Sequence, residues 1–284
     1  MLEQLNIYGR DKVEQAIKRL QDYEPEDGYY LAFSGGKDSV TIKALADMAG
    51  VKYDAHYQVT SIDPPELVQF VKTFDDVSMD IPRDKDGKAY TMWRLIVEKR
   101  IPPTRVARYC CLYLKEHGGT GRFKVTGVRH AESTKRKNRG GVESSTSLRG
   151  RYVVYDPDTD PEAVKQAIEG KKVRILNPII DWSTEDVWQF IREHGVRYCS
   201  LYDEGFTRLG CVGCPMATKP IRLHEFERWP KMRAAYIRAF DKMIADRIAD
   251  NFPTDWKDGE DVMAWWVHYN DWDGQAQEKK KPAE

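Results

Sequence analysis

Residues 34–39 read SGGKDS, and they directly follow the strand-like run YYLAF at residues 29–33. The two glycines allow a tight turn that exposes consecutive backbone N–H groups. A helical pattern begins after the turn, and a helix N-terminus adds further N–H donors and the positive end of the helix dipole. The order of strand, turn and helix therefore predicts a phosphate-binding loop, with a plain surface turn as the alternative. The common P-loop places Ser or Thr after its lysine to bind magnesium, whereas here Asp38 follows Lys37.

The composition limits the classes of protein to consider. The chain has 284 residues, enough for one large domain or for one domain with a helical addition. Its 45 basic and 45 acidic residues balance, so any attraction to nucleic acid or to a membrane must be local. Residues 1–23 are charged and amphipathic rather than a signal peptide, and no apolar run is long enough to span a membrane. We therefore expect a cytoplasmic protein with no membrane partner.

Apolar spacing predicts alternating helices and strands. The first helix falls within residues 1–28, the second runs from the loop to Gly50, and a third is expected over residues 66–74. Further strands are expected at residues 53–60, 122–127 and 173–176. This alternation predicts an α/β fold with a parallel sheet covered by helices.

The chain changes character after residue 220. Large apolar residues recur at helical spacing from Trp229 and again from Val262, which predicts a helical region over residues 221–272. We interpret these aromatic residues as core rather than as a ligand cage. Residues 273–284 are polar and rich in lysine, which indicates a disordered tail. The nucleotide-binding domain is accordingly expected over residues 29–220.

The five cysteines of a cytoplasmic chain indicate metal or redox chemistry rather than disulfides. Four of them form two groups, the adjacent pair Cys110-Cys111 and the Cys-x-x-Cys turn at Cys211 and Cys214. Adjacent side chains point apart, which suits different irons of one cluster better than a single zinc ion. The two groups together supply the four thiolates of a [4Fe–4S] cluster. A four-thiolate zinc site, a redox dithiol at the second group and four unconnected core cysteines are the alternatives.

A basic segment lies between the two cysteine groups. Residues 122–151 contain nine Lys or Arg and two acidic residues, and their Gly-rich and Ser-rich composition favours a mobile loop. Clustered arginines suit phosphate or sulfate, because the guanidinium fork binds such anions through two bonds. The loop at residues 135–139 could instead hold the backbone of a tRNA or DNA acceptor, or it could be a solvated basic loop.

These motifs, in this order, resemble the phosphoadenosine phosphosulfate (PAPS) reductase family within the PP-loop adenine nucleotide alpha-hydrolase-like superfamily. The broader group includes adenylylsulfate reductases with a [4Fe–4S] cluster and the DndC-type enzymes of DNA phosphorothioation. Further segments are similar to family motifs, namely TSIDPPE at residues 60–66, GVRHAES at 127–133, NPIIDW at 177–182, and residues 202–210. The resemblance covers roughly residues 25–220. It implies a doubly wound, mainly parallel five-stranded sheet with a C-terminal helical extension.

The resemblance also implies the residues of a nucleotide site. We expect nucleotide contacts at Ser34, Gly35, Gly36, Lys37, Asp38, Ser39, Thr60, Asp63, Gly127, Arg129, Ser133 and Arg136. The loop N–H groups and Lys37 would hold the nucleotide phosphates and stabilise charge at the α-phosphate. Asp38 would orient Lys37 or a magnesium ion, and Arg129 with Arg136 would clamp the far phosphates or a sulfate.

One departure from the family concerns the nucleophile. Sulfonucleotide reductases carry a C-terminal Glu-Cys-Gly-Leu-His segment whose cysteine attacks the sulfonyl sulfur, and this sequence has no cysteine after Cys214. Cys199 is the cysteine outside the four expected ligands. It is interpreted either as a catalytic persulfide carrier or as a small buried residue.

Three functions are compatible with these motifs. The preferred one is an ATP-dependent sulfurtransferase that adenylates an acceptor, such as nucleic acid, and replaces oxygen with sulfur. The alternatives are a PAPS or adenylylsulfate reductase that releases sulfite, and a nucleotide-binding sensor without turnover. The expected partners are the adenine nucleotide, a sulfur-donor or electron-donor protein, and further copies of the chain in a homo-oligomer.

Overall fold

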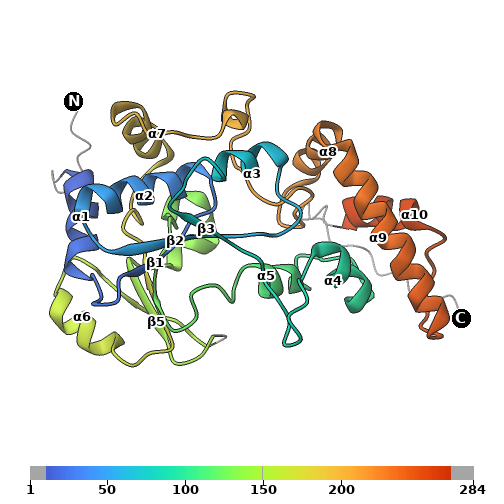
Figure 1. Ribbon diagram of the computed structural model, residues 1–284, viewed down its shortest axis with the longest axis horizontal. Helices are drawn as coiled ribbons and strands as arrows, with labels where there is room; N and C mark the ends of the chain where they lie inside the picture. The colour runs from blue at the N-terminus through green and yellow to red at the C-terminus, as the bar shows by residue number, and fades with distance from the viewer. Residues whose placement is uncertain (1–10, 149, 270–284) are drawn as a thin grey trace, which may run out of the picture. The chain divides into compact units, whose positions relative to one another are not determined.

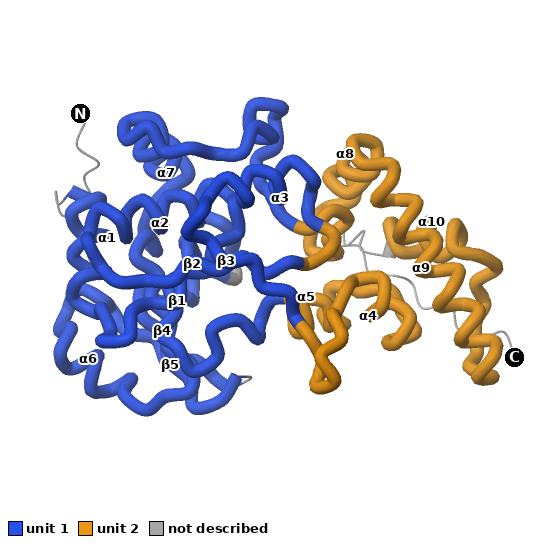
Figure 2. Tube along the Cα trace, viewed as in Figure 1, with its two compact units in different colours: residues 1–59, 63–82, 115–210 blue, residues 60–62, 83–114, 211–284 orange. Residues whose placement is uncertain are grey.

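The structure, a computed structural model, describes residues 11–148 and 150–269. The chain forms two compact units (Figure 2). The first contains residues 1–59, 63–82 and 115–210, and the second contains residues 60–62, 83–114 and 211–284. The second unit thus combines the C-terminal helices with residues 83–114, which the sequence analysis placed in the nucleotide-binding domain. The predicted tail at residues 273–284 lies outside the described residues.

A seven-stranded sheet forms the centre of the first unit, in the order β3-β2-β1-β4-β7-β5-β6. The five neighbouring strands from β3 to β7 are parallel, which confirms the predicted α/β fold with a mainly parallel sheet. β5 and β6 add an antiparallel edge. The strands span Tyr29–Ala32 (β1), Tyr53–Gln58 (β2), Val77–Asp80 (β3), Phe123–Val125 (β4), Val142–Ser145 (β5), Val153–Tyr155 (β6) and Val173–Leu176 (β7).

The sheet has two more strands than the five that the resemblance implied, namely β5 and β6, and β3 was not located from the sequence either. β5 carries Glu143, Ser144 and Ser145, so its sequence lacks the apolar alternation of a strand. All four of its residues are nevertheless buried, since the strand pairs with β6 on one side and β7 on the other. The interpretation of this part of the basic segment as a mobile loop is therefore wrong.

Helices α1, α2 and α7 pack together in the first unit (Figure 1). α2 ends at Gly50, as predicted, where the backbone turns left-handed with φ of 67°. The α-helices of this unit span Lys12–Asp22 (α1), Lys37–Ala49 (α2), Pro65–Val71 (α3), Pro161–Ile168 (α6) and Thr184–Glu193 (α7). Its short 3-10 helices span His130–Glu132 (η1), Thr134–Asn138 (η2) and Ser200–Tyr202 (η3).

The second unit is helical in its described residues. Its helices span Met92–Lys99 (α4), Tyr109–Leu114 (α5), Lys219–Arg228 (α8), Pro230–Ala249 (α9) and Gly259–Tyr269 (α10). The long helix α9 packs against α4 and α10. Tyr236 of α9 and Trp266 of α10 are fully buried, with ring centroids 4.9 Å apart. These aromatic residues therefore form the core of the unit.

Arg19 ties α1 to two loops of the first unit. Its side chain is 5% exposed and donates to Asp158 at 2.6 Å and to Asp181 at 2.9 Å. It also donates to the carbonyl oxygen of Pro178 at 2.8 Å. One buried guanidinium thus satisfies three acceptors in two loops that are far from α1 in the sequence.

Arg19→Ala should destabilise the protein by about 3 kcal/mol, because it leaves two carboxylates without the cation that neutralises them. Lys18→Ala is the matched control, since the Lys18 side chain is 72% exposed and pairs only with Asp22 of the same helix among the interactions described. Its expected cost is below about 1 kcal/mol. Chemical denaturation of both variants measures the difference, and equal midpoints would contradict the role of Arg19.

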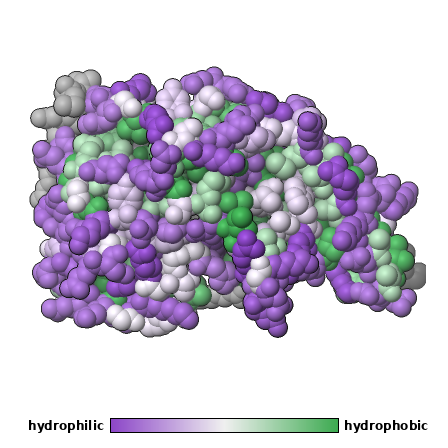
Figure 3. All heavy atoms as spheres, viewed as in Figure 1, coloured by the Kyte–Doolittle hydropathy of each residue, from purple (hydrophilic) through white to green (hydrophobic). Residues whose placement is uncertain are grey.

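The described residues contain no helix that is both long and apolar enough to cross a membrane. The face of the molecule drawn in Figure 3 is mostly hydrophilic and carries small, separate apolar patches.

Candidate functional site

The glycine-rich loop follows β1, the strand at which the order of the sheet reverses. β1 pairs with β2 on one side and with β4 on the other. In open α/β sheets, ligands bind beyond the carboxyl ends of the strands at such a reversal. Gly127 and Arg129 follow β4. The topology of the sheet therefore brings together the two segments that the sequence predicts to contact a nucleotide.

Gly35 allows the loop to turn. Its φ is +73°, and a Cβ atom there would lie 2.7 Å from the side chain of Val71 and 2.8 Å from that of Leu67. Helix α2 begins at Lys37, and its N-cap residue Gly36 has no side chain to bond the first backbone N–H groups. The first N–H groups of α2 are therefore left to bond a ligand or residues from elsewhere in the chain.

Two serines close the loop from within. The hydroxyl of Ser34 donates to the Ser39 hydroxyl at 3.2 Å. The Ser39 hydroxyl donates in turn to the carbonyl oxygen of Gly36 at 2.9 Å. Both side chains therefore stabilise the turn in this structure.

Asp38 links two cations. One of its carboxylate oxygens accepts a bond from Lys37 Nζ at 3.2 Å, and the other accepts one from Arg129 Nε at 2.7 Å. Arg129 is 1% exposed and also donates to the carbonyl oxygen of Trp182 at 3.2 Å. A Cβ atom at Gly127 would lie 3.0 Å from the backbone of Asp38, so glycine permits this close approach of the two loops.

A cavity of about 240 Å³, here called the anion cavity, opens beside these residues. Its lining consists of Lys37, Arg129, Ala131, Glu132, Ser133, Arg136, Thr184, Thr207 and Arg208. Burial lowers the pKa of Arg136, and the neighbouring charges of Arg208 and Arg139 lower it further. Cations that crowd together in this way favour the entry of an anion. The serine and threonine hydroxyls add donors suited to phosphate or sulfate oxygens.

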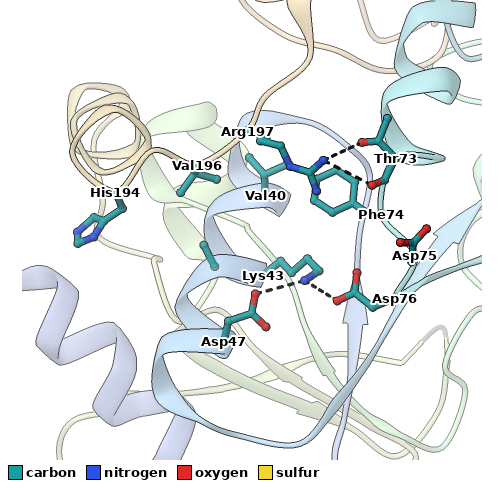
Figure 4. A pocket seen from close by; sticks show the side chains of 11 residues that line it. Val40, Lys43, Asp47, Thr73, Phe74, Asp75, Asp76, His194, Val196 and Arg197 are labelled. Carbon is teal, nitrogen blue, oxygen red and sulfur yellow. Dashed lines mark hydrogen bonds and ion pairs between the residues drawn. The ribbon is translucent and has the colours of Figure 1, made fainter.

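A larger hollow of about 550 Å³ lies along α2 and the ends of α3 and α7 (Figure 4). Its buried cation, Lys43, pairs with Asp76 at 2.7 Å and with Asp47 at 3.2 Å. Arg197 lies over the ring of Phe74, 4.4 Å from the centroid. Because two carboxylates already balance Lys43, this hollow is less suited to an anionic ligand than the anion cavity.

Of the predicted nucleotide contacts, Lys37, Arg129, Ser133 and Arg136 line the anion cavity, and Thr60 and Asp63 are two that do not. The carboxylate of Asp63 accepts the hydroxyl of Tyr57 at 2.6 Å. Thr60 belongs to the second unit, where its hydroxyl accepts a bond from the Cys211 thiol at 3.8 Å. Neither residue lines the cavity, so their nucleotide contacts stay predictions.

The sequence analysis did not name Thr184, Thr207, Arg208 or Tyr202 as site residues. Thr207 and Arg208 lie in a segment that precedes the Cys-x-x-Cys turn, and Tyr202 begins that segment. Its similarity to a family motif was the available signal, but it gave no indication that these side chains lie beside the loop. The hydroxyl of Tyr202 accepts the backbone N–H of Lys37 at 2.8 Å.

The basic loop at residues 135–139 is η2 in large part, and two of its arginines are paired. Arg136 pairs with Glu132, and Arg139 pairs with the fully buried Glu143 at 2.5 Å. Lys137 is exposed. These pairs reduce the positive charge that the loop offers to a nucleic-acid backbone, whose contact here stays a prediction.

Cys199 lies at the start of η3 and is 1% exposed. Burial raises the pKa of its thiol above the ordinary value. A buried and protonated thiol is a poor nucleophile. The environment thus suits a small buried residue better than a persulfide carrier.

The other four cysteines lie in the second unit and influence one another. The neighbouring Cys111 thiol and burial raise the pKa of the Cys110 thiol, and Cys211 and Cys214 raise it further. Burial raises the pKa of Tyr236 well above its ordinary value, and the same distant thiols contribute. The two cysteine groups, about a hundred residues apart in the sequence, thus belong to the same compact unit.

The Cys-x-x-Cys turn is fixed by its neighbours in the second unit. The carbonyl oxygen of Val212 accepts the Tyr236 hydroxyl at 2.9 Å, and the N–H of Gly213 donates to Glu225 at 2.7 Å. Arg108 Nη2 lies 3.4 Å from the sulfur of Cys111. In residues 11–148 and 150–269, no three or more His, Cys, Asp or Glu side chains close around a metal position. The four thiols with a nearby guanidinium nevertheless have the donor chemistry of a thiolate-bound metal.

Similarity to known proteins extends over most of the chain. The sequence profile described as "Phosphoadenosine phosphosulfate reductase domain" matches residues 28–217. An adenosine 5'-phosphosulfate reductase of Pseudomonas aeruginosa is 27% identical over 230 residues, which are 77% of this chain and 76% of that protein.

Two further proteins are similar to this chain, one over a smaller share of its own length and one with a low structural similarity. An uncharacterized protein of Methanocaldococcus jannaschii is 27% identical over 213 residues, which are 71% of this chain. The chain spans less than half of that protein, since the match covers 44% of it. The crystal structure of a PAPS reductase from Candida auris, in a phosphate complex, has a TM-score of 0.46 and 14% identity, with 69% of this chain and 87% of that chain covered.

Proposed function

Because the chain belongs to the phosphoadenosine phosphosulfate reductase domain family, we propose that it binds ATP at residues 34–39 and uses it for sulfur transfer to an acceptor. The observation that carries this proposal is the anion cavity. Lys37, Arg129, Arg136 and Arg208 converge on it directly beside the N-terminus of α2. Four cations at the end of a helix suit the multiple charges of a triphosphate or of pyrophosphate.

The first step in this proposal is adenylation of the acceptor. An acceptor oxygen attacks the α-phosphate, a new O–P bond forms, and pyrophosphate leaves. The loop N–H groups and Lys37 hold the phosphates, while Arg129 and Arg136 stabilise the charge that develops on the leaving group. Asp38 already accepts bonds from Lys37 and Arg129, so we assign it to positioning these two cations rather than a magnesium ion.

The second step replaces oxygen by sulfur. Sulfide (HS−) delivered by a donor attacks the activated carbon, a C–S bond forms, the C–O bond breaks, and AMP leaves with the acceptor oxygen. Cys199 is buried, so we expect the sulfur to come from a separate donor rather than from this thiol.

Cys110, Cys111, Cys211 and Cys214 are the residues that would hold a [4Fe–4S] cluster. Their mutual influence within one unit and their thiol chemistry fit this group. When bound, such a cluster would supply electrons or tune the local electrostatic field. The chain's own contribution is to fix the Cys-x-x-Cys turn through Tyr236 and to place Arg108 beside Cys111.

A second candidate is reduction of adenylylsulfate or PAPS to sulfite. It is favoured by the relative named adenosine 5'-phosphosulfate reductase, which this chain matches over 76% of its length. The anion cavity would then hold a sulfate or a phosphate of the sulfonucleotide. A third candidate is a nucleotide sensor, which would bind ATP without turnover.

Substrate tests separate the candidates. The full chain, purified without oxygen, should release pyrophosphate from labelled ATP in the presence of a sulfur donor and an acceptor, with tRNA, DNA and no nucleic acid as parallel arms. Thioredoxin-dependent sulfite release from adenylylsulfate or PAPS would favour the reductase instead. ATP binding without any turnover would favour the sensor, and failure to bind all three nucleotides would exclude the three candidates together.

A further inference from the structure

Tyr202 supplies the N-terminal cap that α2 does not supply for itself. Its hydroxyl oxygen accepts the backbone N–H of Lys37 at 2.8 Å, across 165 residues of sequence. The N-cap residue Gly36 has no side chain, and a Cβ atom there would lie 3.4 Å from this hydroxyl. A phenol oxygen is therefore in direct contact with the loop that we propose to bind phosphate.

The position of the Tyr202 ring is set by aromatic packing. The ring meets Trp188 edge-on, with centroids 5.0 Å apart, and lies 6.4 Å from the ring of Tyr198. The preceding residue, Leu201, is fully buried and fixes η3 in the first unit. The hydroxyl therefore stays at the loop without help from a ligand.

The Tyr202 hydroxyl can still donate one hydrogen bond. A phenol oxygen can accept one bond and donate another. In the part of the chain that the structure describes, the Tyr202 oxygen accepts from Lys37 and its proton has no acceptor. Burial raises the pKa of Tyr202, so the proton is retained at neutral pH. Lys37, whose backbone N–H bonds to this hydroxyl, lines the anion cavity, so the hydroxyl lies beside a residue of that cavity.

We propose that Tyr202 is a phosphate-binding residue, whose hydroxyl accepts the Lys37 N–H and donates its proton to a phosphate oxygen of the bound ligand. The inference rests on the proposed function, because it concerns the same loop and cavity. In this arrangement the O–H of Tyr202 takes the place of the Lys37 N–H as a donor to the phosphate. The competing arrangement is displacement, in which phosphate takes the Lys37 N–H and Tyr202 has to move away.

Tyr202→Phe tests the proposal, with inorganic pyrophosphate and ATP as probes in calorimetric titrations of the full chain. The variant should bind pyrophosphate about tenfold or more weakly, since a hydrogen bond to a charged group is lost and the Lys37 N–H loses its acceptor. Tyr198→Phe is the matched control. Its ring contacts Trp188 at 5.3 Å, but its hydroxyl donates to Asp203 rather than facing the loop. The control should bind within about twofold of the natural protein.

Fluorine NMR gives a readout that does not depend on removing the hydroxyl. With 3-fluorotyrosine placed at residue 202 or at residue 198, pyrophosphate should shift the signal of residue 202 and leave that of residue 198 in place. If Tyr202→Phe binds pyrophosphate as tightly as the natural protein, or if saturation with pyrophosphate leaves the signal of residue 202 unshifted, the inference about Tyr202 is overturned while the proposed function stands. Tighter binding by Tyr202→Phe would establish displacement instead. Failure of the natural protein to bind pyrophosphate or ATP would overturn the proposed function.

Discussion

Arg129→Ala is expected to lower ATP-dependent pyrophosphate release by at least about a hundredfold. The side chain is 1% exposed, it donates to Asp38 at 2.7 Å, and it lines the anion cavity. The variant removes a cation from the leaving group and leaves Asp38 to pair with Lys37 alone. Labelled ATP, followed by separation of pyrophosphate, measures the loss.

Two further variants make this test specific. Arg129→Lys keeps the charge but loses the planar fork whose separate nitrogens donate to Asp38 and to the carbonyl oxygen of Trp182, so activity should fall between the natural protein and Arg129→Ala. Lys137→Ala removes an exposed charge from the same basic segment and should leave activity within about twofold. Full activity in folded Arg129→Ala, with an unchanged denaturation midpoint, would contradict the role of Arg129.

Cys211→Ser is expected to reduce bound iron from about four atoms per chain to near zero, because a [4Fe–4S] cluster requires all four thiolates for stable binding. Cys110→Ser should have the same effect, since its thiol lies in the same group. Iron analysis and the visible absorption of anaerobically purified protein measure the loss. Cys199→Ser is the control, because this buried thiol belongs to the other unit, and it should retain iron.

The metal content of the natural protein decides between the alternatives. About one zinc and no iron would establish the four-thiolate zinc site instead of the cluster. Iron retained at full level by both Cys110→Ser and Cys211→Ser would exclude these cysteines as ligands.

The sequence predicted the parts of the site that depend on local backbone geometry. The glycine-rich loop and the start of α2 follow from two glycines between a strand pattern and a helix pattern. Gly127 and Arg129 were predicted from the resemblance of residues 127–133 to a family motif, and the reversal of strand order at β1 explains why β4 brings them to the loop.

Other features depend on contacts that no local pattern carries. β5 is polar in sequence, and it becomes a buried strand only because β7 and β6 pair with it on both sides. Tyr202 reaches Lys37 across 165 residues, so its role depends on how η3 packs on Trp188 and its neighbours. For the same reason, the contact between Thr60 and Cys211, which are 151 residues apart, could not be predicted from the sequence.

The division of the second unit into separate stretches of chain has a consequence for biosynthesis. The ribosome completes Cys110 and Cys111 roughly a hundred residues before Cys211 and Cys214, and α9 and α10 come later still. A nascent chain that ends shortly after Cys111 therefore has two of these four thiols. It also lacks Tyr236, whose hydroxyl bonds to the Cys-x-x-Cys turn. The cluster that we propose at these four cysteines would therefore form only after this region is translated, and the early pair would be open to oxidation until then.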